Sequence, residues 1–312
     1  MKIAAVNFNA TFADVEANLE KVAYYVQEAA MQGAELVLFP EFFPSAIGFS
    51  EKMLDVPIHS ANIQRFLQEL ASKHNVIIGG SYLSFNGKET HNLFQMVFPY
   101  GSIFSHRKDI PTIAENCYYT TGDENHVFHT PIGDIGVALC WEMVRNDTLK
   151  RLSGRVDLVL AASCWADLPE GAPLGEYNRA FTYKTPAEFA KRLHTPVIHS
   201  NHCGTIDAVA FDYPSDDRIR TFQMIGATQM VDEDGRIIAQ RTFDEGEGLI
   251  FSEFDLNRAE RKPADIDGSK YWIEDLPGPY LYSWEIFGEE GRAYYENIAR
   301  PYYIENKKIK KD

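Results

Sequence analysis

The stretch Gly136-Val-Ala-Leu-Cys-Trp-Glu-Met143 carries an apolar run up to a cysteine and then changes character. Such a run, within residues 133–142, predicts a buried β-strand that delivers the thiol of Cys140 to its own end. That position suits a nucleophile, because residues on strands are held more precisely than residues in loops. It equally suits a core residue, since a free cysteine behaves as a small hydrophobic side chain.

Strands and helices alternate on both sides of this stretch. Apolar residues at helical spacing, between an N-cap at Asp14 and a stop at Gly33, predict an amphipathic helix over 14–32 that lies on a sheet. Asp234-Gly235 is a strong turn signal inside a predicted hairpin over 227–240. Without a linker or an internal repeat, this alternation predicts one α/β domain over residues 1–256. The remaining predicted elements are strands at 2–8, 35–41, 75–85, 91–99, 102–108, 156–165, 195–204 and 248–256, helices at 60–74, 144–153 and 176–194, and an irregular segment at 109–131.

Composition narrows the possible partners. The chain has 312 residues, of which 45% are hydrophobic and 24% charged, which is enough apolar material for a large core. A formal net charge of −15 repels phosphate backbones and anionic membrane faces, so we expect neither nucleic acid nor a membrane as partner. The basic residues 307–311 form the one basic cluster, which is more simply a solvated tail.

Cysteine usage and the chain ends indicate a compartment. The four cysteines are widely spaced and form no Cys-x-x-Cys pair, so free thiols are expected rather than disulfides or a zinc knuckle. The first residues lack the apolar region of a signal peptide, and no apolar segment is long enough to cross a bilayer. These features predict a cytoplasmic protein.

Residues 257–312 differ from the rest of the chain. They are dense in aromatic residues but show little periodicity. Leaving so much apolar surface in water is unfavourable by roughly 25 cal/mol per Å². We therefore expect this extension to pack on its own domain or on a partner subunit.

Three apolar strands end at an ionisable residue: Glu41 after LVLFP, Lys108 after SIFSHR and Cys140 after VAL. Each alone has a simpler explanation, as a helix cap or surface ion pair, a solvated charge or a buried thiol. Together they meet the needs of a cysteine hydrolase. Burial could raise the pKa of Glu41 until it accepts the thiol proton. Lys108 and the Trp141 backbone N–H could stabilise an oxyanion.

The ordered motifs FPE at 39–41, RK at 107–108 and CWE at 140–142 resemble the carbon-nitrogen hydrolase (nitrilase) superfamily. The resemblance covers roughly residues 1–255 and places the catalytic Glu, Lys and Cys on Glu41, Lys108 and Cys140. A second family glutamate matches Glu115, which is followed by Gly122. The resemblance implies a four-layer αββα sandwich, a homodimer, and a mechanism without a metal or organic cofactor.

The implied substrate is a small molecule with an amide or N-carbamoyl group, hydrolysed through a thioester on Cys140. Aromatic residues beside the catalytic positions predict an apolar substrate pocket, although packing is the simpler role for each of them. A metal site at His199 and His202 is not expected, because strand alternation separates them and no acidic partner lies at ligand spacing. The predicted pocket residues are Trp141, Phe42, Tyr118 and Trp165.

Alternatives stay open. A nitrilase that converts a nitrile to acid and ammonia would use the same residues. The sequence CWEMVRND lacks the aromatic-Pro-Glu turn of many amidases and does not continue the nitrilase pattern either, so it leaves the branch undecided. Acyl transfer and glutamine-fed amidotransfer are less favoured, because the chain shows neither a membrane span nor a synthetase domain. A binding protein that keeps the fold without turnover is the alternative from another class.

Overall fold

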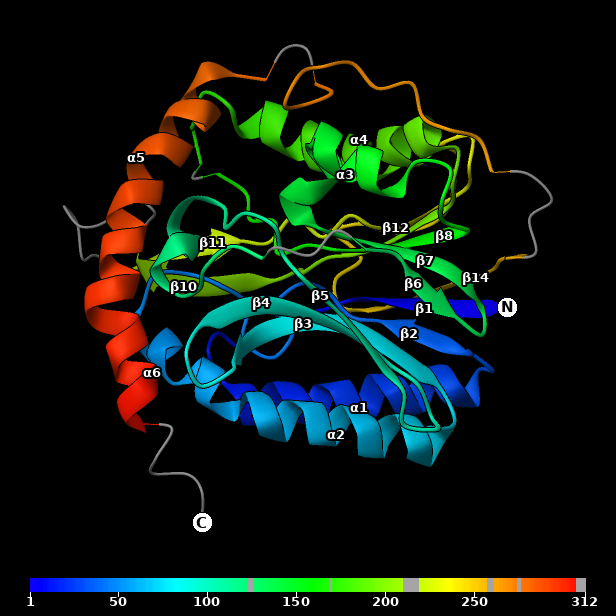
Figure 1. The fold of residues 1–312 in the computed structure, drawn as a ribbon, viewed down its shortest axis with the longest axis horizontal. Coiled ribbons are helices and arrows are strands. Elements are labelled where there is room, and N and C mark those ends of the chain that lie inside the picture. Colours follow the sequence, from blue (N-terminus) through cyan, green and yellow to red (C-terminus); the bar gives the residue numbers. More distant parts are fainter. Residues whose placement is uncertain (123–125, 169, 210–218, 257–260, 274–275, 307–312) are drawn as a thin grey trace.

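Two six-stranded sheets form the centre of the molecule (Figure 1). The computed structural model describes residues 1–122, 126–168, 170–209, 219–256, 261–273 and 276–306. The first sheet has the order β14 (Gly248–Glu253), β1 (Lys2–Asn7), β2 (Leu36–Leu38), β3 (Ile77–Phe85), β4 (Thr90–Val97) and β5 (Ile103–Arg107). The second has the order β13 (Ile237–Arg241), β12 (Thr228–Val231), β9 (Val197–Ser200), β8 (Leu158–Ala162), β7 (Gly133–Leu139) and β6 (Phe128–Thr130).

The sheets pack face to face and helices cover their outer faces. Buried residues from both sheets, among them Leu38, Val137 and Ile198, form one apolar cluster between them. Helices α1 (Val15–Met31) and α2 (Ser60–His74) lie against the first sheet, and α3 (Asn146–Leu152) and α4 (Gly175–Leu193) lie against the second (Figure 1). The predicted four-layer αββα sandwich is therefore confirmed.

Helix α1 shows how local sequence produces one of these layers. The Asp14 side chain accepts a hydrogen bond from the Ala17 N–H at 3.1 Å and so caps the first turn. The buried residues Val22, Val26 and Ala29 recur at helical spacing and form the face that packs on the sheet.

Strand directions place Glu41 and Cys140, which follow β2 and β7, at the same end of the sandwich. β1, β2 and β3 run parallel in the first sheet, and β7, β8 and β9 run parallel in the second. The turns that follow β2 and β7 therefore leave the carboxyl ends of parallel strands, where open α/β folds commonly bind ligands.

Some predicted boundaries are wrong. The strand expected over 133–142 ends at Leu139, because Cys140 takes a left-handed backbone conformation and opens the 3₁₀ helix η4 (Cys140–Val144). The segment expected to be irregular contains the 3₁₀ helix η3 (Ile113–Cys117) as well as β6. The strand expected over 195–204 stops at Ser200, and the chain then pairs β10 (Thr205–Val209) with β11 (Ile219–Gln223) in a separate small sheet.

The C-terminal extension is helical where it is described. Helix α5 (Gly278–Tyr294) runs along one side of the sandwich and continues through the π-helical turn η5 (Tyr295–Ala299) into α6 (Arg300–Asn306) (Figure 1). Its Tyr295 hydroxyl accepts a hydrogen bond from the Thr90 N–H at 2.8 Å, and Tyr303 is fully buried beside Phe85. These contacts tie the extension to the first sheet, while a domain boundary at residue 256 stays a prediction. No helix within the described ranges has the length and apolar character needed to span a bilayer.

Candidate active site

Three turns at the carboxyl ends of the strands bring the predicted catalytic residues into one buried region. Glu41 follows β2, Lys108 follows β5 and Cys140 follows β7. Their exposed fractions are 0%, 1% and 4%. A buried Glu and a buried Lys are unusual unless they are paired, so this location already points to an ion pair.

Lys108 lies between two carboxylates. Its Nζ is 2.9 Å from Glu41 Oε1 and 2.7 Å from Glu115 Oε2. Glu115 belongs to η3, and its Oε2 also accepts hydrogen bonds from the Thr112 N–H at 2.9 Å and from the Tyr119 hydroxyl. One cation therefore faces two buried acids.

Because two acids face one cation, the pKa values of Glu41 and Lys108 are both raised. Burial raises the pKa of Glu41 to about 7, an effect that Lys108 opposes and the charge on Glu115 reinforces. Burial would lower the pKa of Lys108, but Glu115 and Glu41 raise it above its ordinary value, so the ammonium stays charged. A carboxylate that titrates near neutral pH is the property that a general base needs.

The Glu41 carboxylate is held at both oxygens. Asn92 on β4 donates to Oε1 at 2.7 Å, and the Cys164 N–H donates to Oε2 at 3.1 Å. The backbone carbonyl of Glu41 is 2.7 Å from His202 Nε2. These contacts fix the direction of the carboxylate, and neither Asn92 nor His202 was expected from the sequence to take part.

Cys140 follows β7 of the second sheet, whereas Glu41 and Lys108 follow strands of the first. Burial raises the pKa of its thiol, and the charge on Glu41 raises it further, whereas Lys108 and the Cys164 backbone lower it. The thiol is therefore protonated at neutral pH and needs a base before it can attack. Strands β7 and β8 pair at Leu139 and Ala162, so Cys140 lies beside the segment that leads to Cys164, whose N–H donates to Glu41.

Three of the eight described non-glycine residues with positive φ belong to the segments that carry the site residues. Phe42 follows Glu41, Ile113 opens the helix that carries Glu115, and Cys140 begins η4, each with φ of 52°. Non-glycine residues pay on the order of 1–3 kcal/mol for this left-handed conformation, and Ile is among the least suited to it. Such strain clusters at functional sites, because only a precise arrangement of side chains justifies it.

A buried glutamate two residues after Cys140 stabilises the turn. Glu142 accepts hydrogen bonds from the Leu139 N–H and the Asp109 N–H, each at 2.8 Å, and lies 3.0 Å from His106 Nε2. Burial would raise the pKa of Glu142, but His106 and Arg151 lower it, so the carboxylate is ionised. Because His106 and Asp109 flank Lys108, this carboxylate links the cysteine turn to the lysine strand.

Only glycine fits at position 122, because the backbone there lies against the backbone of residues 107 and 108. Its N–H donates to the Lys108 carbonyl at 2.8 Å, and a Cβ there would lie 2.5 Å from the Arg107 carbonyl oxygen. The backbone beside Lys108 can approach this closely only without a side chain.

The predicted pocket residues fall into two groups. Trp141 and Trp165 belong to the same apolar cluster as Cys140, with ring centroids 5.4 Å apart. Phe42 and Tyr118 are fully buried in the cluster beneath the first sheet, where the Tyr118 hydroxyl bonds to the Ser50 backbone. Their roles in substrate binding stay predictions.

The cluster beside Cys140 also contains aromatic residues that sequence reasoning missed. The ring of Tyr280 in α5 lies 5.7 Å from that of Trp141, and Phe181 in α4 lies 5.5 Å from it. Asn178 accepts hydrogen bonds from both Tyr280 and Trp165, at 3.1 and 3.3 Å. The many aromatic residues of the C-terminal extension indicated that it packs on the protein, but the sequence did not indicate that it packs beside Trp141.

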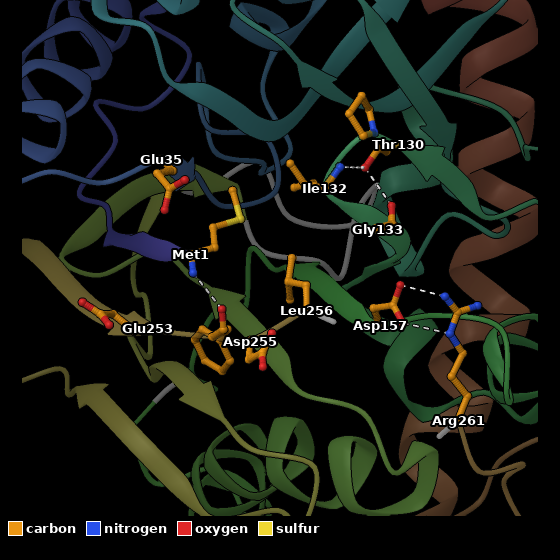
Figure 2. Close-up of a pocket in the computed structure, with 12 residues that line it drawn as sticks. Met1, Glu35, Thr130, Ile132, Gly133, Asp157, Glu253, Asp255, Leu256 and Arg261 are labelled. Carbon is orange, nitrogen blue, oxygen red and sulfur yellow. Dashed lines mark hydrogen bonds and ion pairs between the residues drawn. The ribbon is translucent and has the colours of Figure 1, made fainter. Parts of the chain in front are cut away.

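A different cavity of about 920 Å³ lies at the amino ends of the strands (Figure 2). It is lined by Met1, Glu35, Asp157 and Arg261, among others, and includes none of the catalytic candidates. Across the described part of the chain, no group of three or more His, Cys, Asp and Glu side chains is arranged to hold a metal ion.

Comparison with known proteins agrees with this geometry. The model of the carbon-nitrogen hydrolase family matches residues 2–264, and the chain belongs to that family. Nitrilase 3 of Arabidopsis thaliana is 32% identical over 165 residues, which span 46% of this chain and only 47% of that protein. Citrullinase of Francisella tularensis is 24% identical over 97% of this chain and 99% of its own length.

Solved structures share the fold. A mutant of the amidase from Nesterenkonia sp. AN1, with acrylamide added at its active-site cysteine, superposes with a TM-score of 0.67. The match covers 82% of this chain and 93% of that one at 16% sequence identity. At this level of identity the likeness establishes the architecture alone.

Proposed function

We propose that this protein is a cysteine hydrolase that cleaves a non-peptide C–N bond in a small amide or N-carbamoyl compound. The observation that carries the proposal is the buried network of Glu41, Lys108 and Glu115 beside Cys140. It supplies a base near neutral pH, a fixed positive charge and a thiol that needs activation.

In the proposed first half-reaction, Glu41 takes the proton from the Cys140 thiol as the sulfur attacks the carbonyl carbon. Lys108 and the Trp141 N–H donate to the oxyanion, where fixed donors in a dry site have their largest effect. The protonated Glu41 then gives its proton to the departing nitrogen. The C–N bond breaks, ammonia or an amine leaves, and a thioester remains on the sulfur.

In the second half-reaction, Glu41 takes a proton from water and the hydroxide attacks the thioester carbon. The C–S bond breaks, the sulfur recovers the proton, and a carboxylic acid is released. Glu115 keeps Lys108 in place throughout, through its 2.7 Å contact. Each proton removed is returned, so the cycle needs no cofactor.

A nitrilase activity is the second candidate, supported by the 32% identity to Nitrilase 3 over about half of the chain. The citrullinase relative, which aligns over nearly the whole chain, supports including ureido compounds among the substrates. Both candidates use the same nucleophile and differ in the group that is attacked.

The test is ammonia release from a panel of amides, N-carbamoyl compounds and nitriles, with Cys140→Ala as the matched variant. We expect turnover of an amide or carbamoyl compound by the native protein and none by the variant. Acid and ammonia formed from nitriles, with amides untouched, would favour the nitrilase. Equal turnover by both proteins would refute the mechanism, and inertness toward the panel with ordinary thiol reactivity at Cys140 would favour a binding protein.

A further inference from the structure

A second cavity near the catalytic turns differs in charge from the rest of the protein. It has a volume of about 780 Å³ and lies between the turn after β5, the segment at 270–271 and helix α5. Its cationic lining residues are Arg145, Lys270 and Arg292, and Glu289 is the one acid among the residues that line it. A volume of this size suits a small molecule.

The positive lining is unusual for this chain, whose net charge is −15. Asp109 pairs with Arg145, so Lys270 and Arg292 remain against Glu289. In contrast, the three other described cavities are each lined by at least three acids and by one or two Lys, Arg or His residues. Within the described ranges, neither Lys270 nor Arg292 makes an ion pair.

Two buried polar atoms on the cavity wall lack a hydrogen-bond partner. These are Arg145 Nε, in a side chain whose residue is only 5% exposed, and Thr112 Oγ1. Unsatisfied buried polar groups cost roughly 1–3 kcal/mol each, and because both atoms lie beneath the surface of the wall, a ligand would reach them only if these side chains turned toward the cavity. Ile110 and Leu281 add apolar surface to the same wall.

The cavity is coupled to the reaction centre by direct contacts. The Thr112 N–H donates to Glu115 Oε2, the oxygen that also contacts Lys108. Arg145 directly follows η4, which begins at Cys140, and its side chain pairs with Asp109, the neighbour of Lys108. A ligand that touches Thr112 and Arg145 would therefore touch the supports of both Lys108 and Cys140.

We propose that this cavity is a binding site for a small organic carboxylate. The anionic group lies among Arg145, Lys270 and Arg292, and the carbon skeleton lies against Ile110 and Leu281. The carboxylate has two possible sources: an acid group on the substrate itself, or a separate acid that binds beside the reaction centre. The site does not depend on the proposed hydrolysis, because binding needs no turnover.

The first experiment measures glutarate binding to the full chain by titration calorimetry at low ionic strength. We expect saturable binding that weakens at least about tenfold in Lys270→Gln/Arg292→Gln, roughly one 1.4 kcal/mol step for the lost charges. Both side chains are exposed, so the fold should tolerate the change. Lys73→Gln removes one exposed positive charge on α2, outside the cavity; it is the control for a general effect of surface charge and should bind as the native protein does. No binding to the native protein, or equal binding to the double variant, would overturn the proposal.

A second arm identifies the source of the carboxylate. If it belongs to the substrate, the double variant should lower kcat/KM for acidic amides and leave their neutral analogues unchanged. If it is a separate acid, glutarate should alter the hydrolysis of neutral amides by the native protein and lose this effect in the double variant. Failure of catalysis with binding intact would count against the proposed function and not against this site.

Discussion

Two charge networks, each with one cation between two carboxylates, lie at opposite ends of the strands, and the pKa of a carboxylate is raised in one and lowered in the other. At the carboxyl ends Lys108 lies between Glu41 and Glu115. At the amino ends Arg261 lies between Asp157 and Asp134, and Figure 2 shows its contact with Asp157. The contacts to Arg261 are both 2.7 Å, so distance does not distinguish the two networks.

Access to water distinguishes them. The Lys108 side chain is 0% exposed, whereas that of Arg261 is 34% exposed. Burial raises the pKa of Glu41 to about 7 despite its cation. Although burial would also raise the pKa of Asp134, hydrogen bonds from His129 and Arg261 lower it. Enclosure therefore leaves Glu41 with a pKa near neutral, whereas the pKa of the partly exposed Asp134 is lowered.

The largest test of this contrast is Glu41→Gln. The amide keeps the shape and can still accept from Asn92, but it cannot take a proton, so kcat should fall about 10²–10⁴-fold. Ammonia release at saturating substrate measures the loss, with circular dichroism to confirm folding. A variant that kept its rate within threefold would show that another group is the base.

Glu142→Gln tests whether a third buried carboxylate, beside Glu41 and Glu115, positions the site. Loss of the charge that faces His106 and Arg151 should disturb the turn at Cys140 and lower kcat on the order of 10²-fold, with KM changed little. Breaking a buried pair also costs about 3–5 kcal/mol of folding free energy. The rate of Cys140 alkylation separates the two effects, because a purely structural role would leave it unchanged in the folded fraction.

The pH dependence sharpens the comparison within the native protein. Because Glu41 must be ionised to act, kcat/KM should fall about tenfold per pH unit below about 7 and level off above it. The folded state binds this proton more tightly than the unfolded chain, in which the carboxyl has its ordinary pKa of 4.5. The contribution of Glu41 to stability is thus fully present below 4.5 and is lost as the pH rises through about 7. A flat rate profile between pH 5 and 8 would contradict this assignment.

Arg261→Gln should have the smallest effect. Its ion pairs are partly exposed, so we expect a loss of about 1 kcal/mol or less, seen as a small shift in Tm. Turnover should stay within twofold of the native rate. A large loss of activity would show that the amino ends of the strands matter to catalysis, and the contrast would fail.

The comparison also explains what could be predicted from the sequence. The apolar runs before Glu41, Lys108 and Cys140 are local signals, and a strand forms within each run, although its ends differ from the predicted ones. That these ends meet is a non-local fact, because it depends on how two sheets pack. Only the resemblance to a known family implied it.

Other features lay outside the reach of pattern reasoning. The predicted strand at 133–142 stops early because Glu142 folds back to the Leu139 N–H, an interaction that strand periodicity does not register. The helices of the extension were missed because their buried residues contact several elements instead of one continuous face. Tyr280 packs on Trp141, whereas Tyr294 packs on Phe49 and Tyr118. The cationic cavity joins residues 145, 270 and 292, which no short motif could connect.

The contact between helix α5 and η3 can form only after α5 has been translated. Gly291 lies so close to η3 that a Cβ would come within 2.7 Å of Asn116 Cβ, and Asn116 directly follows Glu115. A ribosome releases Glu41, Lys108 and Cys140 long before it translates Gly291. During synthesis the turn that carries Glu115 therefore lacks this contact until Gly291 has been translated. A nascent chain should acquire its full reactivity only after α5 has left the ribosome.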